Sequence, residues 1–186
     1  MTSIIRADNI STVAGTGNIS LNTGNKIVSP DVGGIVAPGM LIQRQVYSFK
    51  TQVLVTSQSF VDVFTCSFTP KSTTSRIYLS CNLHYGKRAA GELQFPHKFL
   101  RNTTDVTNTM TAVLGGSTYD VMRFPDTSQA NGHMYTLCQA YDEPATTSAI
   151  TYKFQILKTN SGYADVYINF NNNTGGSVIT IDEIAQ

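Results

Sequence analysis

The sequence lacks tryptophan and is poor in charged side chains. Charged residues make up 13% of its 186 positions, about half the share of roughly 25% that is usual in soluble proteins. The 13 basic and 12 acidic side chains leave a net charge of +1, so we expect no nucleic-acid binding and no attraction to an anionic membrane. Ser, Thr and Asn together fill 53 positions. The surface is therefore predicted to be polar but mostly uncharged.

Long hydrophobic runs and a secretory signal are also missing. No apolar run approaches the roughly 18 residues of a membrane helix, and the first residues lack a basic and an apolar region. We therefore expect no membrane insertion, and folding in a reducing cytoplasm. The odd number of cysteines indicates small buried hydrophobic residues rather than disulfides. These cysteines are Cys66, Cys81 and Cys138.

Four Asn-X-Ser/Thr matches follow from the composition, and without a signal they imply no glycosylation. They begin at Asn9, Asn18, Asn102 and Asn172.

The first 39 residues have too few apolar side chains to fold alone. Two short apolar alternations follow turn signals at residues 17–21 and 24–28, which suits a strand donated to another subunit or an intertwined stalk. The alternative is a flexible tail. Pro38-Gly39 predicts a turn into the following domain. We therefore predict a docking arm and linker over residues 1–39 and a second domain over 40–186. The apolar side chains expected to make the arm's contacts are Ile4, Ile5, Ile10, Ile19, Leu21 and Ile27.

From residue 40 onward, apolar and polar side chains alternate with the period of a β-strand. Such strands present one apolar and one polar face, and two sheets of them bury their apolar faces against each other. We predict an all-β fold, an antiparallel β-sandwich of the jelly-roll type preceded by an extended N-terminal arm. The clearest strand patterns cover 45–57, 60–68, 76–85, 148–158 and 166–170, and weaker ones cover 91–100, 109–114, 119–123, 134–141 and 177–184.

A search for catalytic chemistry finds no nucleophile elbow, phosphate loop or metal-ligand spacing. We expect no enzyme activity, no cofactor and no metal. His84 falls on the polar side of its strand and is predicted to be solvated, while His97 is predicted to lie at a bend. Either imidazole is a candidate sensor of pH near neutrality, where histidine side chains usually titrate. Asp62 falls among phenylalanines, so it indicates a bulge, a salt bridge or a subunit contact.

Tyrosines at polar strand positions give a weaker signal. Tyr78, Tyr135 and Tyr167 alternate with predicted core residues. Exposed tyrosines stack on sugars or anchor protein interfaces, and they also pair across strands. We interpret these three as a possible recognition surface. Loops within 101–131 and the segment 87–96 are further candidates, because loops at the ends of a sandwich often carry function.

Both ends of the chain resemble structural proteins of tailed bacteriophages, marine phages in particular. The resemblance rests on SIIRADNI at 3–10 and GTG at 15–17, and on DEPATTSAITYK at 142–153, YIN at 167–169 and ITIDEIAQ at 179–186. It implies a virion surface protein, commonly a homotrimer, with an attachment arm and an outward β domain. The long shaft of a tail fibre is absent from this sequence.

These observations lead to one main hypothesis and three alternatives. The main hypothesis is a short fibre or spike that contacts a glycan or protein of the host surface, with its arm bound to other virion proteins. A decoration protein of the capsid or tail is the first alternative, and a free carbohydrate-binding module is the second. A small hydrolase ranks last, because no catalytic constellation supports it.

Overall fold

A computed structural model of the chain describes residues 37–107, 120–124, 131–171 and 175–186. Chain contacts separate a compact unit, Val36–Gln186, from the preceding segment, and only the compact unit is described below. The six isoleucine and leucine residues of the predicted arm therefore lie outside the described residues, as does the weak strand prediction at 109–114. The domain boundary at residue 40 stays a prediction.

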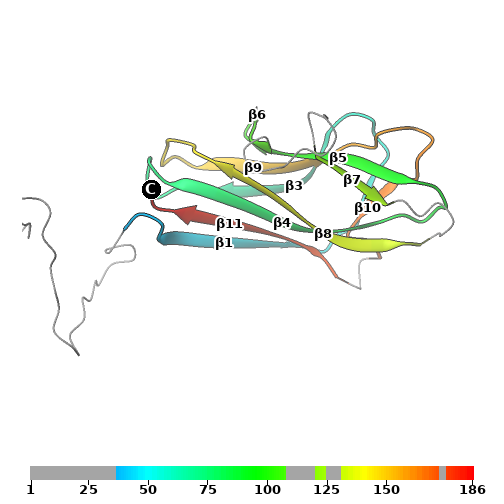
Figure 1. Ribbon diagram of the computed structural model, residues 1–186, viewed down its shortest axis with the longest axis horizontal. Helices are drawn as coiled ribbons and strands as arrows, with labels where there is room; N and C mark the ends of the chain where they lie inside the picture. Colours follow the sequence, from blue (N-terminus) through cyan, green and yellow to red (C-terminus); the bar gives the residue numbers. More distant parts are fainter. Residues whose placement is uncertain (1–36, 108–119, 125–130, 172–174) are drawn as a thin grey trace, which may run out of the picture. The chain divides into compact units, whose positions relative to one another are not determined.

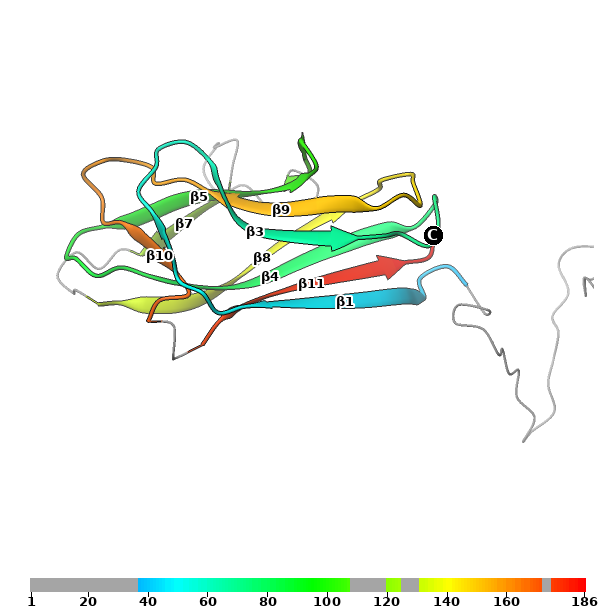
Figure 2. The same cartoon turned by 180° about the vertical axis from the view of Figure 1, so that it is seen from behind.

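The compact unit is built from antiparallel strands in two layers, which confirms the all-β prediction (Figure 1). The larger sheet contains β1 (Leu41–Phe49), β2 (Val53–Val55), β4 (Arg76–Gly86), β8 (His133–Asp142), β10 (Val166–Ile168) and β11 (Ser177–Ile184). The smaller sheet contains β3 (Val61–Phe68), β5 (Leu93–Arg101), β6 (Thr104–Asp105), β7 (Asp120–Phe124) and β9 (Ile150–Ile156). Figure 2 shows the same two layers from behind.

Strand pairing follows a nested pattern. β1 pairs with β11, β3 with β9, β4 with β8, and β5 with β7, all antiparallel. The first long strand thus pairs with the last. Moving inward along the chain from both ends, the second long strand pairs with the second last, and so on to β5 and β7. The resulting orders, β1-β11-β4-β8 and β3-β9-β5-β7, are those of a jelly roll with two Greek keys. The sandwich is therefore a long double-stranded ribbon that is wound into two sheets.

The core fills the space between the two sheets with aromatic and branched side chains. Phe49 of β1 stacks on Phe64 of β3 with ring centroids 4.3 Å apart, and so joins the layers. Phe154 is fully buried and lies 4.9 Å from Phe99 and 6.2 Å from Phe64. Burying each such side chain away from water stabilises the fold by on the order of 1.5–3 kcal/mol. Strand alternation thus places one side of every long strand in this core.

The chain enters β1 through the predicted turn. Gly39 has a φ of 84°, and the Met40 amide donates to the Ala37 carbonyl at 3.0 Å. Proline at the second position and a positive φ at the third are the features of a type II turn, where glycine is favoured. The amide of Gly39 then donates to Ala185, so the turn is attached to the end of β11.

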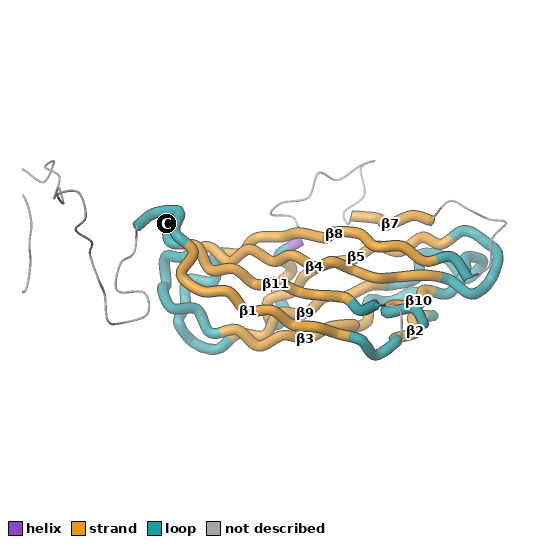
Figure 3. The backbone as a smooth tube through the Cα atoms, turned by 90° about the horizontal axis from the view of Figure 1, so that it is seen from below, coloured by secondary structure: helices purple, strands orange, loops and turns teal. Residues whose placement is uncertain are grey.

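The single strand predicted over 45–57 is wrong, because the chain leaves the extended conformation between Phe49 and Val53. The facing strand is interrupted at the same level. β10 and β11 both pair with β4, at Tyr85–Gly86 and at Arg76–Asn82, with residues 169–176 between them. Figure 3 shows β2 and β10 beside the ends of β1 and β11. Phe170, expected in the strand at 166–170, lies just beyond it.

The predicted alternation over 60–68 changes phase at a bulge. The register between β3 and β9 shifts between Asp62 and Phe64, so Asp62 faces outward while Phe64 faces the core. The Asp62 carboxylate accepts hydrogen bonds from Lys153 at 2.7 Å and from Gln155 at 2.5 Å. Partial burial acts to raise the pKa of Asp62, but these hydrogen bonds and the charge of Lys153 lower it overall. Two of the three predicted explanations, a bulge and a salt bridge, are thus confirmed.

Candidate assembly surface

The outer side of the larger sheet presents a broad surface without charge at its centre. Two adjacent rows of side chains cross β1, β11, β4 and β8 in register, and no member is ionisable. We call them the central rows. They consist of Ser48, Val178, Asn82 and Leu137, and of Val46, Thr180, Ser80 and Gln139.

Two apolar side chains in the central rows are unusually open to solvent. Val46 and Leu137 are each 58% exposed. Both lie at outward-facing strand positions, where alternation predicts a polar residue. Burying such side chains against a partner is favourable by about 25 cal/mol per Å² of apolar surface. The central rows therefore have the composition of an interface core, from which charged residues are depleted.

On the side toward Arg76, the charges beside the central rows are already paired within the sheet. In the next row, Arg44 holds Asp182 with two hydrogen bonds of 2.6 and 2.7 Å. Beyond it, Arg76 donates to Glu143 at 2.8 Å. Paired charges add no net charge to the surface, and the pairs themselves contribute little stability where they are exposed.

The outer side of the smaller sheet has a different character. Its middle carries Asp62, Lys153 and Lys98, which occupy neighbouring positions on β3, β9 and β5. Lys98 also places its ammonium 4.3 Å from the ring centroid of Phe60. Burying these charges under a partner protein would need compensating partners. Of the two outer sides, that of the larger sheet is the better suited to packing against protein.

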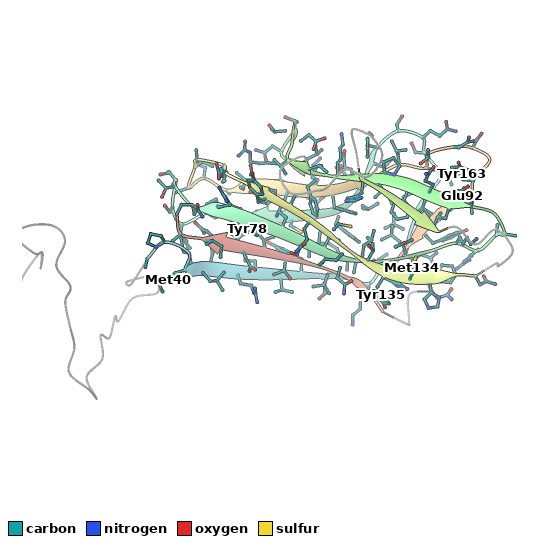
Figure 4. All side chains as sticks on the ribbon, in the orientation of Figure 1. Met40, Tyr78, Glu92, Met134, Tyr135 and Tyr163 are labelled. Atoms are coloured by element: carbon teal, nitrogen blue, oxygen red, sulfur yellow. The ribbon has the colours of Figure 1, made fainter. Side chains whose placement is uncertain are left out.

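The three tyrosines predicted to form a recognition surface all lie on the outer side of the larger sheet, at its two ends. Tyr78 pairs with Tyr141 across the strands, with ring centroids 6.3 Å apart. Tyr135 lies toward the other end of the sheet, opposite His84 (Figure 4). Because Tyr78 and His84 are separated by six positions on one strand, the two ends are about 20 Å apart. The tyrosines therefore do not form one continuous platform.

The end that contains Tyr135 is a cluster of rings that extends over the chain after β10. His84 stacks on Tyr135 at 4.5 Å, and its ring meets the edge of His133 at 5.5 Å. His133 in turn stacks on Phe170 at 5.9 Å. Phe170 also contacts Tyr167 at 5.9 Å. We call these five rings the histidine cluster.

The prediction that His84 is solvated is wrong, since its side chain is 0% exposed. Phe170 can lie over β4 because residue 86 is glycine. A Cβ at Gly86 would stand 2.6 Å from the Gly132 carbonyl oxygen and 3.0 Å from Phe170. The sequence pattern missed the covering of His84 because the rings that contact it, those of His133 and Tyr135, lie 49 and 51 positions further along the chain. His97 was also mispredicted: it lies inside β5, is buried, and packs 5.4 Å from Phe154.

Asn169 joins the interrupted strands behind the histidine cluster. Its side chain donates to the Thr51 carbonyl at 2.9 Å and accepts from the Ser177 amide at 2.8 Å and hydroxyl at 2.7 Å. The Asn169 amide donates to the His84 carbonyl, and the His84 amide donates to the Ser177 hydroxyl. One buried asparagine thus replaces several missing strand hydrogen bonds.

Two buried carboxylates have structural partners. Glu183 accepts hydrogen bonds from the Lys71 and Ser72 amides and from the Ser75 hydroxyl, which fixes the loop between β3 and β4. Asp142 accepts from the Tyr152 hydroxyl at 2.8 Å and from Arg101 at 3.1 Å. Burial first, and then the charge of Asp142, raise the pKa of Tyr152. Both carboxylates are thus held by structural hydrogen bonds, and the charge of each acts to raise the pKa of Tyr152.

The cysteines are reduced and buried, as predicted. Cys81 and Cys138 stand directly opposite each other on β4 and β8. Burial raises the pKa of the Cys66 thiol to about 12 and also raises that of Cys81. These thiols are therefore protonated at neutral pH and are poor nucleophiles.

Within the described ranges, no group of three or more His, Cys, Asp or Glu residues is placed to hold a metal ion. In the same residues, no helix has both the length and the apolar character to cross a membrane.

Comparison with known proteins gives only distant likenesses. No family model matches the chain, and no curated protein matches it. Among solved structures, a mutant VP2 protein of infectious bursal disease virus in T=1 particles has a TM-score of 0.38 at 10% identity. The match covers 87% of this chain and 41% of that one, so the chain spans less than half of that VP2. A mud crab dicistrovirus structure has a TM-score of 0.22 at 8% identity, covering 99% and 90% of the two chains. At these scores the likenesses carry no argument about function.

Proposed function

We propose that this chain is a non-enzymatic structural subunit of a virion and that it packs against neighbouring protein through the outer side of its larger sheet. The observation that carries the proposal is the pair of central rows, eight positions without a charge across four strands. A protein interface needs a core free of unpaired charge and a rim of polar groups. The central rows supply the first, and the Arg44–Asp182 and Arg76–Glu143 pairs supply the second.

The more specific proposal is a short fibre or spike of a tailed bacteriophage, built as a homotrimer. The sequence resemblance at residues 3–10 and 142–153 supports it. Under this proposal residues 1–39 bind other virion proteins, and the sandwich contacts a glycan or protein of the host surface. The protein would fold in the host cytoplasm and end in the virion.

A decoration protein of the capsid or tail is a second candidate. One observation favours it: β1 begins two residues after the turn at Pro38-Gly39, so no shaft stands between residues 1–39 and the sandwich. The number of copies per particle distinguishes the two roles, since few copies at a tail indicate attachment and hundreds indicate decoration. Loss of incorporation on deleting residues 1–39 would support the anchoring role of that segment under either candidate.

A free carbohydrate-binding module receives less support. Tyr78 and Tyr135 are about 20 Å apart along the sheet, and each ring already packs against a neighbour. A glycan array with the purified full chain tests this alternative directly. Tight binding of a glycan by the monomer would favour it over assembly.

The assembly proposal is tested by placing charge in the central rows of the full-length protein. Val46→Lys and Leu137→Lys each introduce an ammonium where a partner would exclude water. Since both side chains are exposed in the single chain, we expect folding to be kept, with a change in unfolding free energy below about 1 kcal/mol. Oligomers in solution and incorporation into particles should fall at least tenfold, as measured by light scattering and by particle composition.

Ser67→Lys is the matched control, because Ser67 is an exposed strand residue on the outer side of the smaller sheet. This variant should assemble normally. Unchanged assembly of both central-row variants would refute the proposed surface.

A further inference from the structure

The histidine cluster contains a buried titratable group that the proposed function does not use. The two ring nitrogens of His84 are buried and have no hydrogen-bond partner in the described part of the chain. A neutral imidazole has one donor and one acceptor, and leaving both unpaired away from water is unfavourable. Stacking on Tyr135 and contact with the edge of His133 replace the missing hydrogen bonds with ring packing.

His84 is also connected to the interrupted strands by its main chain. Its carbonyl accepts from the Asn169 amide at 2.8 Å, and its amide donates to the Ser177 hydroxyl at 3.0 Å. The ring next to it, His133, is the first residue of β8 and carries Phe170 on its face. The His84 ring therefore contacts the start of β8, while its main chain contacts the chain on both sides of the strand interruption.

The surroundings of His84 oppose a positive charge. Its ring packs against His133 and Tyr135 of β8, and Phe170 lies beyond His133. Arg88, after β4, places its guanidinium 5.0 Å from the ring of Tyr167 and 5.8 Å from that of Phe170. Further charged groups of the adjoining segments are Lys87, whose Nζ donates to the Gly91 carbonyl, and Lys50, which lies against Gly176. Among the described residues, no carboxylate is hydrogen-bonded or ion-paired to either histidine.

We propose that His84 is the acid-sensitive part of a clasp, formed with His133, which holds Phe170 and the first residues of β8 against the larger sheet when the His84 ring is neutral and releases them when that ring is protonated. The clasp lies at one end of the same outer side that carries the central rows. Protonation therefore places new positive charge at the edge of that surface and loosens its end. The proposal concerns a property of the isolated chain and does not depend on what the surface binds.

The direction of the pH effect follows from the burial. Burial, and then the nearby His133, lower the pKa of His84 below its ordinary value of about 6.5. The opened cluster therefore takes up a proton at a higher pH than the closed one. Stability of the closed cluster is unaffected well above pH 6.5 and falls as the pH drops through that value, by about tenfold in the opening equilibrium per pH unit for each proton bound.

Amide hydrogen exchange of the full chain, corrected for the intrinsic effect of pH, tests the clasp. Between pH 7.5 and pH 5.0 we expect opening at residues 133–136 and at 169–171 to increase at least tenfold. Amides of β9 serve as the internal control, because that strand lies in the other sheet, and they should change less than twofold. His84→Phe keeps an aromatic ring but cannot be protonated, so this variant should lose most of the acid response.

A second measurement does not depend on a variant. NMR titration of the wild-type imidazoles should show His84 titrating below pH 6.5, with the ring resonances of Phe170 changing at the same midpoint. A His84 that titrates at or above pH 6.5, or an acid response that is unchanged in His84→Phe, would overturn the proposal.

Discussion

Glu183 shows how this chain buries a charged residue without a salt bridge. It lies on the core side of β11 and is 0% exposed. Its carboxylate accepts from main-chain amides at Lys71 and Ser72, from the Ser75 hydroxyl and from the Gln43 amide group. Hydrogen bonds to a charged acceptor are roughly twice as strong as neutral ones. One side chain thus fixes the loop between β3 and β4 to the edge of the larger sheet.

Replacing this carboxylate should be costly. In Glu183→Gln, an amide group stands where one oxygen accepted hydrogen bonds, and donors of the loop lose their partner. We expect a loss of about 2–3 kcal/mol in unfolding free energy, measured by urea denaturation. Asp182→Asn is the matched control on the neighbouring residue, whose carboxylate pairs with Arg44 at the surface. It should cost less than about 1 kcal/mol. Equal losses in the two variants would contradict this account.

At the scale of secondary-structure elements, the paired interruption of β1/β2 and β10/β11 is the main departure from a regular jelly roll. Both strands break at the same level of the larger sheet, where Asn169 adopts a φ of 54°. Asparagine tolerates this left-handed conformation better than most residues. Its buried amide then joins Thr51 and Ser177 across the gap. The interruption is therefore a stabilised feature that brings Phe170 over β4.

The hydrogen bonds of Asn169 can be separated from its backbone conformation. Asn169→Ala loses three buried hydrogen bonds and places alanine at a positive φ, so we expect a loss of about 3 kcal/mol. Asn171→Ala is the control, because Asn171 is exposed and has a φ of 60°. It should cost only about 1 kcal/mol. Thermal and urea unfolding of both variants measure the difference, and a similar loss at both positions would show that the buried hydrogen bonds contribute little.

At the scale of the whole molecule, the nested pairing of the ribbon makes every long strand depend on a partner distant in sequence. β1 pairs with β11 and β3 with β9, so the larger sheet needs the first and last strands and the smaller sheet needs strands more than 80 residues apart. Such long-range topology favours cooperative unfolding and slow folding. The three buried cysteines lie on β3, β4 and β8, and they report on this cooperativity.

Thiol labelling should therefore follow global unfolding. Burial raises the pKa of Cys66 to about 12, so at pH 8 the folded protein holds almost no thiolate at this site. We expect Cys66, Cys81 and Cys138 to react at least a hundredfold more slowly in the native protein than in urea, and with one common midpoint. Mass spectrometry after alkylation gives the labelling of each cysteine. Rapid labelling of any one of them under native conditions would reveal an independent local opening.

The sequence predicted most of the strands because alternation depends only on neighbouring residues. The patterns at 76–85 and 148–158 correspond to β4 and β9, and the predicted turn at Pro38-Gly39 is present. The sequence did not predict the breaks at Lys50 and Phe170, since both are compatible with extended backbone. The candidate surface was predicted in part. Tyr78, Tyr135 and Tyr167 do lie on one outer side, whereas the significance of Val46 and Leu137 depends on which strands are neighbours.

Local patterns were enough to specify the fold class, because period-2 alternation without helical periodicity permits only sheets that bury one face. The sequence also determined that the surface carries little charge, since few charged residues exist to place there. The choice of strand partners depends on contacts that form only in the folded chain, and it sets which uncharged positions join into one continuous surface. The folded chain likewise sets the state of His84, because a ring on the polar side of its strand is covered by His133 and Tyr135 of another strand, and no local pattern encodes a contact between residues so far apart in the chain.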